Sequence, residues 1–122
     1  MKNRSLRSLI ASCILLAIAQ YAHALDLGVS YAVYSTPDGK PYIEVNFEIA
    51  AVTLLYKKVD GEKMQAGAEI LIMVKNGDNV VAYEKYNLQS PLVDAAQSLI
   101  DVKRLPVPEG DYELEITVQD LN

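Results

Sequence analysis

Apolar and polar side chains alternate along most of the chain that follows residue 26. Alternation with a period of two indicates a β-strand with one buried face and one solvated face. The alternation is most regular from 42 to 50 and from 111 to 119. Together with the shorter apolar runs, it predicts strands over residues 27–35, 42–50, 52–58, 63–75, 80–88, 98–105 and 111–119.

Turn-forming residues separate these runs. Residues 36–40 contain Pro-Asp-Gly, 59–62 contain Asp-Gly, and 76–79 read Asn-Gly-Asp-Asn. Such residues favour tight reversals, because glycine accepts a positive φ and proline presets its own φ. Prolines also end the runs at 89–91 and 106–110. Only 92–97 is compatible with a helical turn.

The predicted elements are six or seven short strands at a spacing of roughly 8–12 residues, which is typical of a sandwich. The predicted fold class is therefore all-β, an antiparallel immunoglobulin-like β-sandwich. Residues 70–74 are apolar on both faces, so we expect a neighbouring element to cover them. The expected core residues are Ile43, Val45, Phe47, Ile49, Ile70, Ile72, Val74, Leu114, Ile116 and Val118.

The last predicted strand, 111–119, has two notable features. Tyr112 follows Gly110 at the start of a late strand, where a tyrosine corner places its hydroxyl against nearby backbone. Only 120–122 follow the strand. Either this strand is a tolerated edge, or a further segment of the same natural chain or of a partner completes the sheet.

The first 24 residues have the features of an export signal. Lys2, Arg4 and Arg7 precede an apolar run from 9 to 19, and 22–24 read Ala-His-Ala, a small-x-small cleavage site. The run is shorter than the roughly 20 apolar residues that a bilayer span needs. We expect a signal peptide over 1–24, a mature β-sandwich domain over 25–122 without a transmembrane span, and a location in the periplasm or cell envelope. An alternative is lipoprotein processing at Cys13, but that site would leave almost no apolar segment before the cysteine.

Composition after residue 24 excludes several classes of function. All sixteen acidic residues remain there against eight Lys and Arg, which gives a mature charge of −8. This charge argues against a nucleic-acid binder. The only Cys and the only His lie within residues 1–24, and the chain has no Trp. Thiol proteases, Ser-His-Asp hydrolases, histidine-ligated zinc sites and disulfide scaffolds are therefore excluded.

The remaining polar residues have structural interpretations. Glu113 and Glu115 share one strand face, as do Glu44 and Glu48, which is the ordinary solvated side of a sheet. Residues 76–79 lack the spaced carboxylates of a calcium loop and are interpreted as a hairpin turn. We expect no catalytic, cofactor-binding or metal-binding residues. Seven tyrosines after residue 24 leave sugar binding open as a minor alternative.

Two segments, 80–91 (VVAYEKYNLQSP) and 105–120 (LPVPEGDYELEITVQD), resemble the N-terminal sandwich region of exported Bacteroidota-type envelope proteins, including those with a C-terminal GWxTD domain. The resemblance covers most of 25–122, although the sequence contains no GWxTD motif. It implies a partial chain and supplies no catalytic residues.

Three functions are compatible with these observations. The first is a non-enzymatic, exported interaction or structural module of the cell envelope. The second is a strand-exchanging assembly subunit of the pilin type, which would use the edge of 111–119. The third is a glycan- or peptide-binding module. The expected partner is a protein or the remaining part of a longer chain.

Overall fold

The computed structural model describes residues 24–122, so the signal peptide and the alternative site at Cys13 lie outside the described residues. Every strand pairing within this range is antiparallel. The described residues contain one short 3-10 helix, η2 (Ala51–Thr53), and eight strands. The strands are β1 (Leu27–Ser35), β2 (Pro41–Ile49), β3 (Lys57–Asp60), β4 (Lys63–Gln65), β5 (Gly67–Asn76), β6 (Asn79–Gln89), β7 (Leu99–Pro106) and β8 (Glu113–Asp120).

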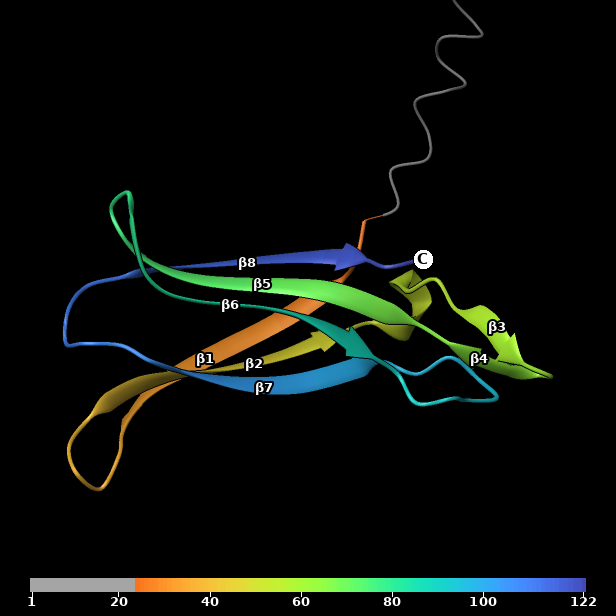
Figure 1. The fold of residues 1–122 in the computed structure, drawn as a ribbon, viewed down its shortest axis with the longest axis horizontal. Helices are drawn as coiled ribbons and strands as arrows, with labels where there is room; N and C mark the ends of the chain where they lie inside the picture. Colours follow the sequence, from red (N-terminus) through yellow and green to blue (C-terminus); the bar gives the residue numbers. More distant parts are fainter. Residues whose placement is uncertain (1–23) are drawn as a thin grey trace, which may run out of the picture.

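Six of these strands form two sheets that pack face to face (Figure 1). The order is β1-β2-β7 in one sheet and β6-β5-β8 in the other, while β3 and β4 form a separate hairpin. The hairpin projects from one end of the sandwich (Figure 1). The prediction of an all-β antiparallel sandwich is confirmed.

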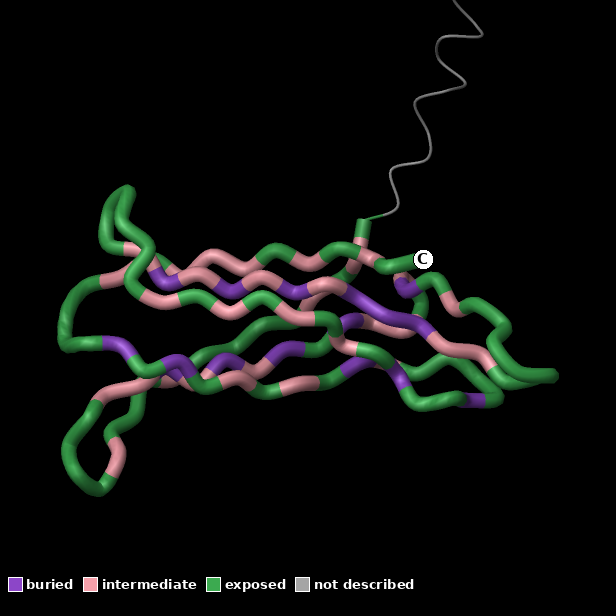
Figure 2. Tube along the Cα trace, in the orientation of Figure 1, coloured by how far each residue is buried: buried purple, intermediate pink, exposed green. Residues whose placement is uncertain are grey.

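The core lies between the two central strands. Alternate residues of β2 and β5 are buried, and the tube in Figure 2 shows buried segments in both layers of the sandwich. The predicted core residues of both strands are buried, with exposed fractions from 0 to 7%. Leu114, Ile116 and Val118 of β8 pack against this core but are only half-buried.

Two predicted strands were wrong in their bounds, and the one stretch compatible with a helical turn does not form one. Residues 52–58 do not form one strand, because 51–53 form η2 and only 57–60 belong to β3. The predicted strand 63–75 is interrupted at Ala66, whose backbone N–H donates to Ser90 Oγ at 3.1 Å instead of continuing the β3–β4 hairpin. Residues 92–97 contain no helical turn, because Val93 forms an isolated bridge with Met64.

The outer face of β5 is covered as its sequence requires. Leu71 and Met73 are half-buried rather than exposed. Met73 lies between Tyr83 of β6 and Glu115 of β8 in the sheet register. Side chains of the two flanking strands therefore shield the second apolar face of β5 without any additional layer.

The topology matches part of an immunoglobulin sandwich. β2 pairs with β7 as strand B pairs with E, and β5 pairs with β8 as strand C pairs with F. Tyr112 stands just before β8, and its hydroxyl donates a long hydrogen bond of 3.5 Å to the Glu109 carbonyl. This tyrosine-corner contact occurs at the corner before strand F in such sandwiches. β8 therefore corresponds to strand F.

Candidate interaction groove

The inner face of β1 is apolar but uncovered. Tyr31 lies directly opposite Val45 of β2, so both side chains leave the sheet on its inner face. Val45 is fully buried, whereas Tyr31 is 65% exposed. Its neighbours on the same face, Val29 and Val33, are 44% and 64% exposed. No described strand of the opposite sheet shields these three side chains.

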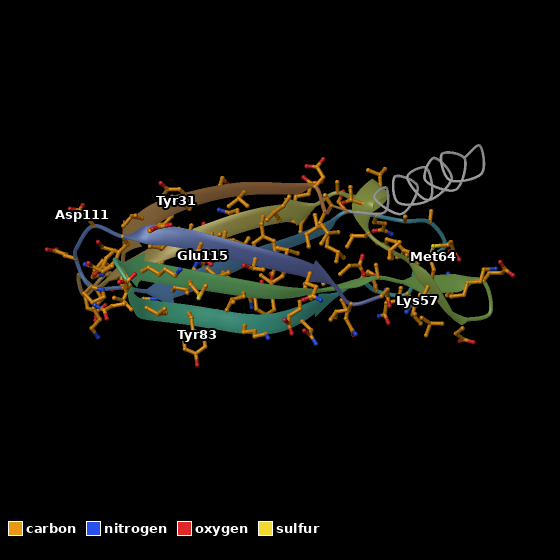
Figure 3. All side chains as sticks on the ribbon, turned by 90° about the horizontal axis from the view of Figure 1, so that it is seen from above. Tyr31, Lys57, Met64, Tyr83, Asp111 and Glu115 are labelled. Atoms are coloured by element: carbon orange, nitrogen blue, oxygen red, sulfur yellow. The ribbon has the colours of Figure 1, made fainter. Side chains whose placement is uncertain are left out.

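Figure 3 shows the geometric reason. Seen from above, β1 forms one long margin of the molecule and lies outside β8, and Tyr31 lies on that margin. β8 is the outer strand of its own sheet, because it pairs only with β5 among the described strands. The β6-β5-β8 sheet therefore ends before it reaches over β1.

We call the resulting strip the β1–β8 groove. It is bounded by Val29, Tyr31 and Val33 of β1 and by Leu114, Ile116 and Val118 of β8. The surface is hollowed at both ends of this strip. One hollow is lined by Leu25, Thr53 and Val118, and the other by Val33, Ile43 and Tyr112. These two hollows mark the ends of the strip.

On the opposite side of the sandwich, polar side chains of β6 and β7 cover the edge of the core. Inner-facing Glu84 and Tyr86 of β6 meet inner-facing Asp101 and Lys103 of β7. The Tyr86 hydroxyl donates to Asp101 Oδ2 at 2.8 Å, and Lys103 Nζ lies 3.2 Å from Glu84 Oε1. Lys103 Nζ also lies 4.0 Å from the centroid of the Tyr86 ring. The side chains at the β6–β7 margin are therefore polar groups that tolerate contact with water.

Partial burial at this margin raises the pKa of the Tyr86 hydroxyl above its ordinary value. The hydrogen bond to Asp101 and the negative charges of Asp101 and Glu84 act in the same direction. The hydroxyl therefore remains a proton donor to Asp101 throughout the neutral range.

The carboxylates considered from sequence occupy outer faces. Glu44 binds Arg104 Nε at 2.7 Å, and Glu48 is exposed opposite Gly28. Glu113 is exposed at the start of β8, and Glu115 forms an ion pair with Lys75. The structure thus places the two glutamate pairs on different sheets, consistent with the solvated faces expected from sequence.

Residues 76–79 form the turn between β5 and β6, with Gly77 at φ 58°. A left-handed conformation at this position explains the glycine. Within 24–122 there is no cluster of three or more His, Cys, Asp or Glu that is arranged to hold a metal ion.

The tyrosines do not form one platform for a sugar. Tyr56, Tyr86 and Tyr112 each have a hydrogen-bonded structural partner. The rings of Tyr34 and Tyr42, on the outer face of the β1-β2-β7 sheet, lie 5.7 Å apart. Tyr83 lies at the margin opposite Tyr31 (Figure 3). The exposed rings are therefore spread over three surfaces.

No protein-family model, no curated protein and no solved structure matches this chain. Among residues 24–122, no helix has the length and apolar character needed to cross a bilayer.

Proposed function

We propose that residues 25–122 form a non-enzymatic, exported module of the cell envelope that binds an extended strand of another polypeptide chain. The strand adds to the free edge of β8 and places alternate apolar side chains over the inner face of β1. This is the strand-exchange alternative inferred from sequence, and it gives a molecular form to the more general interaction role. Export and the resemblance to GWxTD-type envelope proteins remain predictions.

The observation that carries the proposal is the contrast between the two margins. At the β6–β7 margin, inner positions next to water carry Glu84, Tyr86, Asp101 and Lys103. At the β1–β8 margin, the equivalent positions carry only apolar or tyrosine side chains. Large apolar strips are uncommon on monomeric proteins unless a partner covers them. The β6–β7 margin thus carries side chains that tolerate water, whereas the β1–β8 margin carries side chains that are stabilised when a partner covers them. This contrast supports a docking role for the β1–β8 margin.

The fold provides a second argument. In an immunoglobulin sandwich, strand F has a further strand, G, on its outer side. β8 corresponds to F, and a strand at the position of G would lie over β1. Such an addition supplies main-chain hydrogen bonds for affinity and side-chain contacts for specificity. Fully covering the half-exposed Val29, Tyr31 and Val33 contributes roughly 1 kcal/mol each, about half the value for burying a fully exposed side chain.

A thermal-unfolding titration tests the proposal. The ligand is a nine-residue peptide, the length of β1, with Val or Ile at alternate positions and Ser or Lys between them. The control peptide has the same composition with the apolar residues grouped together. At 100-fold excess over Kd the alternating peptide stabilises the fold by about 2.7 kcal/mol. For a domain of this size the melting temperature then rises by on the order of 10 °C.

Equal melting temperatures with both peptides and with none would refute strand binding. Concentration-dependent dimers without peptide, joined through β8, would assign the groove to a second copy of the chain instead. For the non-enzymatic part, steady hydrolysis of an ester, glycoside or peptide substrate that one carboxylate substitution abolishes would contradict the proposal.

A further inference from the structure

The margin of the β1–β8 groove is acidic. Glu113 and Glu115 lie on the outer face of β8, and Glu109 and Asp111 precede it in an exposed loop. Neither β1 nor β8 contains a Lys or an Arg. The cation nearest in register is Lys75 of β5, which is opposite Glu113 and forms an ion pair with Glu115. Figure 3 shows Asp111 and Glu115 along the same side of the molecule as β8.

Elsewhere on the two sheets, two outer-face glutamates are paired with a cation. On the outer face of β5 and β6, Glu69 is paired with Lys85 at 3.0 Å. On the other sheet, Glu44 is paired with Arg104 at 2.7 Å. Glu109, Asp111 and Glu113 have no such partner within 4.0 Å among the described residues. An incoming strand therefore meets uncompensated negative charge at Glu113 and in the loop before it, whereas Glu115 is already paired with Lys75.

This charge argues against a second copy of the chain as the occupant. Two β8 strands paired along their free edges would gather Glu113 and Glu115 of both copies on one sheet face, with no Lys or Arg on either β8 strand to offset the added negative charge. Residues 121 and 122 lie against other segments of the described chain. Leu121 N–H donates to Gly67 O at 3.0 Å, and Asn122 Nδ2 donates to Leu55 O at 2.7 Å.

We infer that the strand accepted by the β1–β8 groove belongs to a different protein and is basic on its outer face, with Lys or Arg opposite Glu113. This inference rests on the proposed function and adds the chemical class of the partner. The apolar side chains of that strand point inward over β1, and its alternate basic side chains extend the outer face of the β6-β5-β8 sheet. A cross-strand pair of opposite charge then forms with Glu113.

The expected preference for a basic peptide follows from one cross-strand pair, with Glu113. An opposite-charge pair contributes a fraction of a kcal/mol to about 1 kcal/mol, which corresponds to about 1.5- to 5-fold in affinity. Because the groups are near the surface, salt screens them. The preference is therefore expected at low ionic strength and decreases strongly toward 1 M salt.

The test uses three nine-residue peptides that share one alternating Val/Ile pattern and carry Lys, Ser or Glu at the intervening positions. Affinities for the protein are measured by calorimetry at low and high salt. At low salt the Lys peptide is expected to bind more tightly than the Ser peptide, and the Ser peptide more tightly than the Glu peptide. At high salt the three affinities should converge.

Substitutions on β8 identify the source of the preference. Glu113→Lys is expected to weaken binding of the Lys peptide and to strengthen binding of the Glu peptide. Binding of the Ser peptide should change little. The matched control is Glu48→Lys, the same charge change at an exposed glutamate on the outer face of β2. It is expected to leave the order of the three peptides unchanged. Circular dichroism of both variants confirms that each is folded.

The outcomes separate the two proposals. If all three peptides bind equally at low salt, strand binding stands and a basic partner is refuted. If none binds, the proposed function itself fails. If Glu48→Lys changes the order as strongly as Glu113→Lys, the preference reflects net charge and not pairing on β8, and the inference is overturned. If protein from its own cells already has a strand of the same chain on β8, the assignment to a different protein is overturned.

Discussion

Tyr31 and Val45 are directly opposite each other on adjacent strands, yet Tyr31 is 65% exposed and Val45 is fully buried. Their side chains share the inner face of one sheet, so the difference comes from the opposite sheet. β5 covers the middle of that face, and no described strand covers the part formed by β1. The β1–β8 groove is the structural consequence.

Changing exposed groove residues should affect binding much more than folding. Val33→Ser removes an apolar side chain that is 64% exposed, so the free energy of unfolding of the unliganded protein should change by less than about 0.5 kcal/mol. Binding of the alternating peptide should weaken several-fold, because apolar contact is lost. Denaturant unfolding and calorimetry on the same samples check both values. Unchanged affinity would mean that the strand does not cover β1.

The core should respond in the opposite way. Ile72→Ala removes a fully buried side chain from the central strand β5, and we expect a loss of about 2–5 kcal/mol in the free energy of unfolding. The matched control is Ile100→Ala on the outer face of β7, where the side chain is 70% exposed. That control should change stability by only a few tenths of a kcal/mol. Comparable losses at both sites would contradict the assigned core.

High pH should weaken the hydrogen bond of Tyr86 at the β6–β7 margin and thereby lower the stability of the fold. The raised pKa of Tyr86 means that its hydroxyl stays protonated in the folded state after the unfolded chain begins to ionise near about pH 10. Its contribution to stability is therefore complete below that pH and decreases as the pH rises further. Tyr86→Phe should lose about 1 kcal/mol at neutral pH and show a smaller decrease above about pH 10. Denaturant unfolding from pH 8 to 11 compares it with Tyr83→Phe, which should behave as the parent protein.

The β5–β6 turn should depend on backbone conformation alone. Gly77 has φ 58°, and a Cβ atom there would meet nothing within 4 Å. Gly77→Ala should cost about 1–2 kcal/mol because of the left-handed conformation, not because of crowding. Gly77→Asn should cost less, since asparagine tolerates this region. The melting temperature of the Gly77→Asn variant should therefore be higher than that of the Gly77→Ala variant. An equal loss in both would indicate a contact that the structure does not show.

Alternation along the chain is sufficient to predict the sandwich, because the alternate apolar positions of each strand identify its buried face. It was insufficient at 52–58 and 63–75, where Leu54 and Ala66 are buried outside regular strands. The free edge of β8 was anticipated from the sequence. The exposed inner face of β1 was not, because alternation shows that Val29, Tyr31 and Val33 share a face but does not show what lies across from it. The absence of charged residues between 27 and 35 gave no means to distinguish a covered strand from an uncovered one.

Residue-resolved hydrogen exchange on β8 tests the central claim most directly. In the free protein, amides of β8 that point away from β5 should exchange quickly, while those bonded to β5 exchange slowly. Saturation with the alternating basic peptide should slow the outward-pointing amides between 113 and 120 and leave those of β6 unchanged. If these amides keep the same exchange rates with bound peptide, or are already slow in a free monomer, the β1–β8 groove does not accept a strand.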